Sequence, residues 1–191
     1  MDNAAAIGME VNPQKMQLLC LTSAINYQVR SFIYCGGRKL LSGDTLKLLG
    51  YTMGWRPGAN HHVKEIRKKY GARAWILRNP KQADIPQSKL VQVYCALIRP
   101  VLEYPAVVFH CGLTEESSDS LECLQSASLR TIFGHHVSYS ECLRKSGLTT
   151  LKDRRDGLLE SFATRAAESN RFAEQWFPTN EPPAYALRRT L

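Results

Sequence analysis

The stretch HHVKEIRKKYGARAWILRN, residues 61–79, decides the fold expected for this 191-residue chain. Its apolar side chains recur at intervals of three or four residues, so they share one face of a helix. They are Val63, Ile66, Tyr70, Ala74 and Leu77. Gly71 is the point at which this helix is expected to be weakest, because glycine costs about 1 kcal/mol relative to alanine inside a helix.

The helical pattern continues toward the C-terminus. The segment that follows Pro86 carries a broad apolar face, and Pro100 and Pro105 are expected to kink or end its helix. Gly134 and Gly147 are typical of helix C-termini, where glycine stops the helix at little steric cost. The further helices are predicted over 115–134, 140–147 and 149–170.

Residues 1–53 have the pattern of short strands and turns instead. Gly36-Gly37 separates two apolar runs and suits a hairpin turn that needs positive φ, whereas Gly50 interrupts a later run. A few short strands cannot bury both faces of a sheet without a covering layer, so this part looks incomplete by itself. The predicted strands lie within 16–23, 29–35, 38–41 and 46–53.

The predicted fold class is therefore α+β, with a small antiparallel β part followed by a mainly α-helical bundle. We expect the β part to span residues 1–53 and the helical domain to span 54–177. Residues 178–191 are expected to form a flexible tail, because the chain ends there in a proline-rich segment.

Charge is concentrated in the middle of the chain. The net charge is +8, and residues 44–110 carry 11 basic against 4 acidic groups, a local excess of +7. Such an excess is expected where one surface meets a polyanion, although a solvated basic face without a partner has the same composition. The chain has no secretory signal pattern, and no apolar run approaches the roughly 18 residues of a membrane-spanning helix. We therefore expect an intracellular protein that does not enter a membrane.

Catalytic motifs are missing from the sequence. It contains no phosphate-binding glycine loop, no nucleophile elbow and no zinc-protease helix motif, and none of its six aspartates are adjacent. Its six cysteines lack the close pair that begins a typical zinc site. Arg154 and Arg155 lie near a helix N-terminus, where cations are disfavoured, so we expect them to pair with Asp153 and Asp156, with phosphate as the alternative.

Six sequence motifs, taken in chain order, resemble the end of the palm and the thumb of non-LTR retrotransposon reverse transcriptases. The palm-like motifs are GMEVNPQKMQLLC (8–20) and SGDTLKLLGYTM (42–53). The thumb-like motifs are HHVKEIRKKYGARAWILR (61–78), ALIRPVLEYPAVVFH (96–110), LECLQSASLRTIFG (121–134) and GLTTLKDRR (147–155). The resemblance covers about residues 8 to 177. It implies that the β part is a palm remnant and that the helical part is a thumb.

The resemblance also implies a function. It implies a fragment of an RNA-directed DNA polymerase that binds the RNA/DNA template–primer duplex, and it assigns no catalytic residue to this chain. The fingers and the upstream palm are missing, so Mg²⁺ is expected only in an intact enzyme. Lys15 would lie near the pyrophosphate, and Leu48, Leu49 and Gly50 would form a hairpin at the primer end. The alternative is a domesticated, non-enzymatic helical module that binds a protein partner.

The most basic predicted helix carries the remaining candidate residues. Steps of about 100° per residue place Lys64, Arg67, Lys68 and Arg78 within an arc of about 100°, with Trp75 inside it. An aromatic ring among cations is typical of surfaces that bind nucleic acid. The alternative is that Trp75 packs against a neighbouring helix and the cations only keep the chain in solution.

Overall fold

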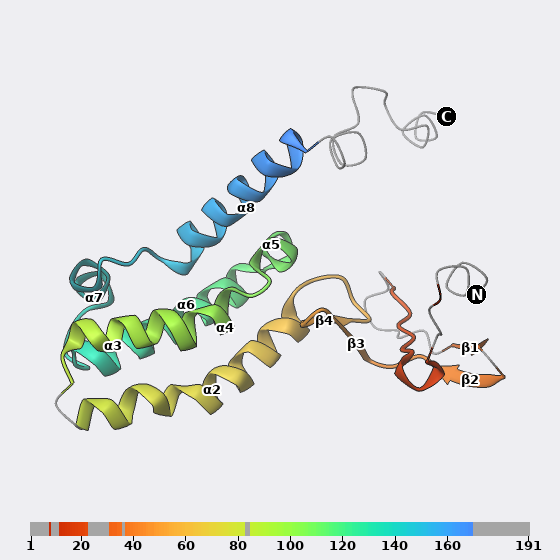
Figure 1. The fold of residues 1–191 in the computed structure, drawn as a ribbon, viewed down its shortest axis with the longest axis horizontal. Helices are drawn as coiled ribbons and strands as arrows, with labels where there is room; N and C mark the ends of the chain where they lie inside the picture. Colours follow the sequence, from red (N-terminus) through yellow and green to blue (C-terminus); the bar gives the residue numbers. More distant parts are fainter. Residues whose placement is uncertain (1–7, 9–11, 23–30, 36, 83–84, 170–191) are drawn as a thin grey trace.

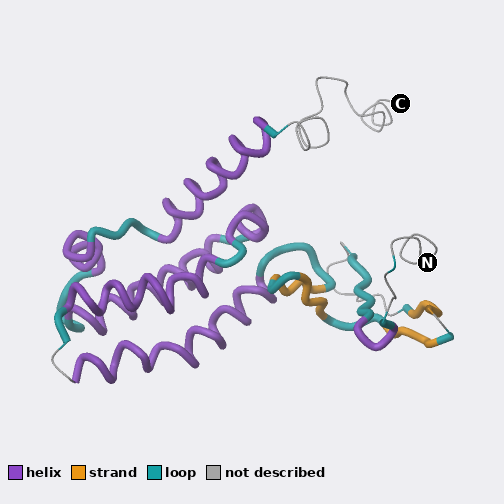
Figure 2. Tube along the Cα trace, in the orientation of Figure 1, coloured by secondary structure: helices purple, strands orange, loops and turns teal. Residues whose placement is uncertain are grey.

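The computed structural model describes residues 8, 12–22, 31–35, 37–82 and 85–169. The described strands precede the helices, which gives an α+β fold with a helical C-terminal part, as predicted. The strands lie at one end of an elongated molecule and the helices extend from them toward the other end (Figures 1 and 2). The tail predicted over 178–191 lies outside the described residues.

The β part consists of two antiparallel hairpins. Strand β1 (Phe32–Cys35) pairs with β2 (Arg38–Leu41), and β3 (Thr45–Leu48) pairs with β4 (Tyr51–Gly54). The predicted hairpin between residues 35 and 38 is confirmed, and Gly37 in its turn has a φ of +74°.

One strand prediction in this part is refined and another is wrong. The run 46–53 forms two strands, and the hairpin expected at Leu48, Leu49 and Gly50 is confirmed: Leu49 and Gly50 both adopt positive φ, +47° and +85°, and turn the chain back on itself. The described part of the run 16–23 forms a single bridge, from Leu18 to Ser42, and no strand. An apolar run becomes a strand only where a partner lies along its length, and the sequence does not show that partner.

Helix α2 (Asn60–Gln82) is the first helix of the helical part, and it continues through Gly71 without a break. The predicted helix ends at Gly134 and Gly147 are confirmed: both glycines have positive φ and follow α6 and α7. The later helices are α6 (Glu115–Phe133), α7 (Tyr139–Ser146) and α8 (Leu151–Glu168).

Prolines divide the segment between α2 and α6, as predicted. Pro100 lies in the first turn of a helix and is preceded by a wider π-helical turn, which accommodates a residue without an N–H. The next helix starts just after Pro105. The elements are α3 (Gln87–Val93), η2 (Tyr94–Ile98), α4 (Arg99–Glu103), α5 (Ala106–Phe109) and η3 (His110–Gly112).

This segment differs from the expectation that no apolar stretch is long enough to span a membrane. Gln87–Gly112 is long and apolar enough to cross a membrane by length and composition, with a mean hydropathy of 1.2. A single helix of this kind is weak evidence, since core helices pass the same test. Leu90, Ile98 and Leu102 of this segment are buried in the helical core.

Two apolar clusters form the helical core. The first, which we call the proximal cluster, lies near the start of α2 and includes Ile66, Leu102, Phe109, Leu121 and Leu151. The second, the distal cluster, lies near the end of α2 and includes Leu77, Leu90, Tyr94, Ile98 and Leu129. Tyr70 of α2 packs against both. Of the five predicted face residues of α2, Val63, Ile66 and Leu77 are buried and Tyr70 and Ala74 are half-buried, so the predicted face is confirmed.

A buried polar group joins α3–η2, α6 and α7. Gln125 is 1% exposed; its Oε1 accepts from the Tyr94 hydroxyl at 2.6 Å, and its Nε2 donates to the Tyr139 hydroxyl at 2.8 Å and the Thr149 carbonyl at 3.0 Å. Burial raises the pKa of both tyrosines far above the ordinary value for tyrosine. Because every polar atom of this amide has a partner, its burial costs little, and it fixes how the three elements meet.

The pairing expected for Arg154 and Arg155 is wrong. Arg154 donates to Glu103 of α4, and Arg155 donates to Ser118 of α6 at 2.7 Å. Neighbours along a helix point in different directions, so Asp153 and Asp156 are poorly placed for these arginines. The arginines join α8 to the rest of the bundle instead.

Alanine substitutions at two glycines are expected to change the free energy of unfolding in opposite directions. An alanine Cβ at Gly50 would lie 2.7 Å from the Tyr104 ring, at a φ of +85° that alanine rarely adopts. We expect Gly50→Ala to lower the free energy of unfolding by about 1–2 kcal/mol. Gly71→Ala is the matched control: it meets nothing within 4 Å inside a helix and should raise stability by about 0.5–1 kcal/mol. Urea unfolding measures both, and a Gly50→Ala variant as stable as the wild type would contradict the turn geometry.

Candidate nucleic-acid interface

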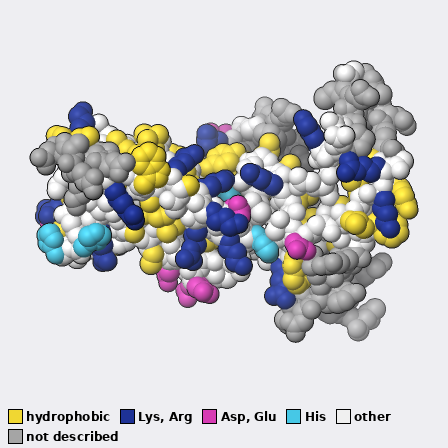
Figure 3. All heavy atoms as spheres, turned by 90° about the horizontal axis from the view of Figure 1, so that it is seen from below, with side chains coloured by type: hydrophobic (Ala, Val, Ile, Leu, Met, Phe, Trp, Pro, Cys, Tyr) yellow, Lys and Arg dark blue, Asp and Glu magenta, His cyan; other side chains and the backbone are white. Residues whose placement is uncertain are grey.

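The side of α2 that faces away from the core carries the predicted cations. Lys64, Arg67, Lys68 and Arg78 are all exposed, and so is Trp75. We call this surface the basic face. Lys and Arg side chains gather over the face on which α2 lies (Figure 3). The structure thus places the five predicted residues of this helix on one exposed surface.

The cations of the basic face differ in how firmly they are held. Lys68 pairs with Glu65 at 2.7 Å, and this bond lowers the pKa of the glutamate. Arg67 donates to Ser120 of α6 at 3.4 Å. Lys64 and Arg78 make no hydrogen bond or ion pair with the part of the chain that the structure describes. Lys64 and Arg78 can therefore bind an anion directly. Arg67 and Lys68 would first have to break their bonds to Ser120 and Glu65.

Trp75 resolves one of the alternatives left by the sequence. Its side chain is 56% exposed, so it is not packed inside the interface between α2 and a neighbouring helix. An exposed indole that is flanked by cations can stack on a base or a sugar. The indole is therefore accessible on the surface of α2.

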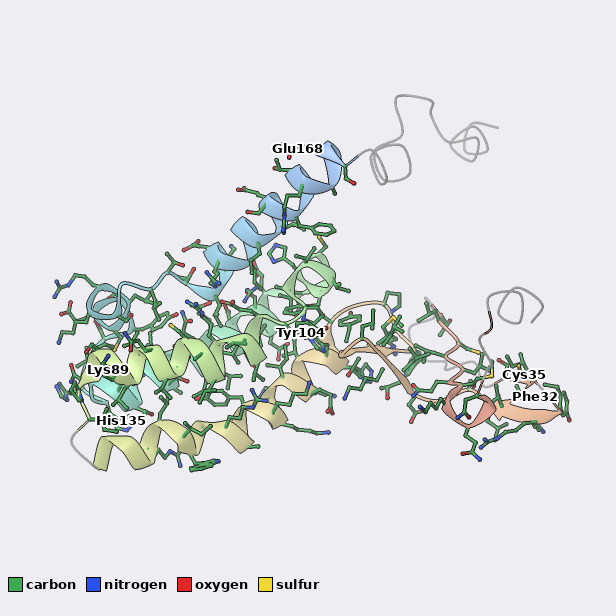
Figure 4. The ribbon with its side chains drawn as sticks, viewed as in Figure 1. Phe32, Cys35, Lys89, Tyr104, His135 and Glu168 are labelled. Carbon is green, nitrogen blue, oxygen red and sulfur yellow. The ribbon has the colours of Figure 1, made fainter. Side chains whose placement is uncertain are left out.

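A groove between α2 and α6 extends the basic face. Its volume is about 230 Å³, and its lining includes Arg78 of α2, Arg130 of α6 and His135 just after α6. His135 lies at the end of the bundle where α2 finishes (Figure 4). The sequence gives no signal for Arg130 and His135 as binding residues, because only the packing of α6 beside α2 brings them next to Arg78.

The predicted hairpin residues lie at the junction of the two parts of the chain. Leu48 and Leu49 are 57% and 84% exposed, and Gly50 completes the turn. The Tyr104 hydroxyl donates to the Leu49 carbonyl at 2.8 Å, which ties the hairpin tip to the helical part (Figure 4). The turn is therefore held in place while its two leucine side chains remain accessible.

His62 makes a second tie at the same junction. It is 1% exposed, its Nε2 lies 3.2 Å from the Tyr104 carbonyl, and its Nδ1 lies 3.4 Å from the Thr52 N–H. A neutral ring with its proton on Nε2 satisfies both contacts, donating at one nitrogen and accepting at the other. Burial lowers the pKa of His62, which favours this neutral form. The histidine holds β4, α2 and the end of α4 together.

Lys15 stands apart from the other predicted residues. It is exposed at the end of the short turn η1 (Pro13–Lys15), which is capped by the Asn12 side chain. The hairpin β3–β4 lies between η1 and α2 (Figure 1). The structure therefore does not bring Lys15 onto the basic face.

No family model, curated protein or solved structure matches this chain. Among the described residues, no group of three or more His, Cys, Asp or Glu side chains could hold a metal ion.

Proposed function

We propose that this chain is a fragment of a retrotransposon-encoded reverse transcriptase that binds the RNA/DNA template–primer duplex with the basic face of α2. The observation that carries the proposal is the exposed Trp75 among the cations Lys64, Lys68 and Arg78. Cations supply the salt-dependent part of binding by contacting phosphates, and the indole supplies a stacking surface. The α2–α6 groove offers a second place for the phosphate backbone, between Arg78 and Arg130.

The proposal assigns binding to this chain and not polymerisation. Phosphoryl transfer at a two-metal site needs carboxylates that hold the ions, and the six aspartates of the sequence include no adjacent pair. In an intact enzyme the fingers and the upstream part of the palm would supply that site and its Mg²⁺. The β3–β4 turn, with Leu48, Leu49 and Gly50, would approach the primer strand, and Lys15 would lie nearer the pyrophosphate. The proposed place of action is inside the cell, where such a duplex forms.

The alternative proposal is a helical module that binds a protein. It is favoured by apolar side chains that remain exposed on η2, just after α4 and on α5: Leu97 is 45% exposed, Tyr104 58% and Val108 60%. These residues lie on elements other than α2. The two proposals therefore place the binding surface on different elements, and separate substitutions distinguish them.

A duplex-binding titration tests the main proposal. A labelled RNA/DNA hybrid with a recessed DNA 3′ end is titrated with the full chain at several salt concentrations, and its fluorescence anisotropy is recorded. We expect binding that weakens linearly on a log–log plot against salt, with a slope set by the number of phosphates contacted. Binding that is absent at low salt, or that has no salt dependence, would overturn the proposal and leave the protein-binding alternative.

Trp75 is predicted to contribute stacking without contributing charge. We expect Trp75→Ala to weaken duplex binding by about 1–3 kcal/mol and to leave the salt slope unchanged. Trp75→Phe keeps an aromatic face and should retain most of the affinity. Val108→Ala, at an exposed apolar residue away from α2, is the matched control and should bind as the wild type does. A Trp75→Ala variant with wild-type affinity would show that the indole does not touch the duplex.

A further inference from the structure

A second pocket lies on the opposite side of α6 from α2. Its volume is about 470 Å³, and it is bounded by η3, the start of α6 and the start of α8. All of its lining side chains except that of Leu113 are polar: His110, Thr114, Glu115, Ser118, Asp119, Lys152 and Arg155. Neither the proposed duplex site nor the resemblance gives this pocket a role.

Arg155 on the pocket wall is a buried cation with unmet hydrogen bonds. It is 1% exposed, and its Nη2 donates to the Ser118 hydroxyl at 2.7 Å. Its Nε and Nη1 are buried without a partner in the described part of the chain. Burial lowers the pKa of Arg155, while the carboxylates of Glu122, Asp156 and Glu103 act in the opposite direction without bonding to it. A buried guanidinium in this state is costly unless another acceptor arrives.

A second buried group on the same pocket is also unpartnered. His110 pairs through Nε2 with Asp156 at 3.0 Å, but its Nδ1 is buried without a partner among the described residues. The pocket also contains the first residue of α6, a helix of 19 residues whose N-terminal end carries partial positive charge. Arg155, with its unpartnered N–H groups, and the N-terminal end of α6 thus line one cavity, whereas a neutral His110 that donates from Nε2 to Asp156 presents Nδ1 as an acceptor and adds no donor for an anion.

The charges around the pocket select the kind of anion. Lys152 adds a second cation, but the exposed carboxylates of Glu115 and Asp119 also line the cavity. These two carboxylates repel a phosphate dianion or a nucleic-acid strand more strongly than a group with a single negative charge. A carboxylate has one charge and about four acceptor positions, which suits the free N–H groups of Arg155.

We infer that this pocket binds a small carboxylate, with Arg155 as its main hydrogen-bond donor and Lys152 as a second cation beside it. The carboxylate belongs either to a free carboxylic acid or to the C-terminus of a peptide; both present the same group to Arg155. The site is separate from the basic face, so its occupancy does not depend on duplex binding.

NMR of the full chain tests this inference, because the Nε–H resonance of Arg155 reports directly on a new acceptor. Sodium acetate is titrated against sodium chloride and sodium phosphate at equal ionic strength. We expect a saturable shift of this resonance with acetate, and a weaker response with phosphate. No saturable response to acetate, or tighter binding of phosphate than of acetate, would overturn the inference.

Variants locate the site and allow for a folding failure. The wild type is expected to show a rise in melting temperature with acetate, and Arg155→Met should abolish that rise. If this variant does not fold, Lys152→Gln decides, because its side chain is exposed and its loss should weaken acetate binding by about 2–5-fold. Lys89→Gln, at an exposed lysine of α3 outside the pocket, is the matched control and should bind as the wild type does. Equal affinities for acetate in Lys152→Gln and Lys89→Gln would place the anion elsewhere.

Two further probes distinguish a free carboxylic acid from a peptide C-terminus. The first is acetyl-triglycine, which presents a peptide C-terminal carboxylate. The second is the C-terminal amide of the same peptide, which lacks the negative charge. Tighter binding of acetyl-triglycine than of acetate, lost in the amide, identifies a peptide C-terminus as the ligand. Similar affinities for acetate and acetyl-triglycine identify a free carboxylic acid. Equal binding of the amide and the acid would contradict a carboxylate site.

Discussion

Replacement of Lys64, Arg67, Lys68 and Arg78 by glutamine is expected to reduce the log–log salt slope of duplex binding by about 3–4. Each cation that contacts a phosphate releases about 0.9 counterions, so four contacts amount to a loss of about 10³-fold in affinity near 0.1 M salt. All four side chains are exposed on α2, and replacing them leaves the buried side of that helix intact. The reduction lies at the lower end of the range if Lys68 keeps its bond to Glu65 instead of a phosphate.

The control for this experiment removes the same charge from other helices. The control replaces four exposed cations that lie on α3, α7 and α8: Lys89, Lys145, Lys152 and Arg165. Their replacement by glutamine lowers the net charge equally, so any common effect is long-range electrostatics and not contact. We expect this control to keep a slope close to that of the wild type. Equal slopes for the two folded variants, measured by anisotropy after circular dichroism has confirmed folding, would move the duplex surface away from α2.

Arg130 extends the same test to the groove. If a phosphate lies between Arg78 and Arg130, Arg130→Gln added to the four substitutions should lower the slope by about one more. Without that extra loss, Arg130 contacts no phosphate of the duplex.

The sequence predicted best what is determined locally. The helix ends at Gly134 and Gly147 depend on backbone conformation, because glycine adopts positive φ at little cost. The apolar spacing within 61–79 depends on the burial of one helix face. Both are properties of a few consecutive residues. The exposure of Lys64, Arg67, Lys68, Trp75 and Arg78 followed from the same spacing, because a face opposite to a buried face is left in solvent.

The errors concern contacts between elements distant in sequence. The hydrogen bond from the Tyr104 hydroxyl to the Leu49 carbonyl, which ties the β3–β4 turn to the helical part, joins residues 55 positions apart and is not visible in the sequence. Arg154 pairs with Glu103 of another helix and not with its own neighbours. Arg130 joins the basic face only because α6 lies beside α2. None of these contacts leaves a periodic signal in the sequence, because each depends on how helices dock.

Gln125 shows an intermediate case. A glutamine among the apolar residues of 121–134 belongs to the motif that resembles the thumb, but the motif alone gives no reason for it. The structure supplies the reason: its amide meets Tyr94, Tyr139 and the Thr149 carbonyl in the interior. Burial of a polar residue requires partners, and the sequence cannot say which side chains provide them.

Phe109→Ala is expected to lower the free energy of unfolding by about 3–5 kcal/mol, the largest stability effect of any single substitution considered. Phe109 is 0% exposed, belongs to the proximal cluster, and packs its ring 5.1 Å from that of His62. Helix α5 has four residues, too few to be stable by itself, so this buried ring is what holds it against the core. A loss of this size is a large part of the 5–15 kcal/mol that stabilises a typical domain.

The neighbouring residue provides the control. Val108 belongs to the same short helix but is 60% exposed, so Val108→Ala should change stability by no more than about 0.5 kcal/mol. Urea unfolding followed by circular dichroism compares the two variants, with Phe109→Leu as an intermediate that leaves a smaller cavity. A Phe109→Ala cost below about 1 kcal/mol would mean that the proximal cluster does not stabilise the helical part as a unit. It would also mean that the start of α2, where His62 meets both Phe109 and Tyr104, is not held by the core.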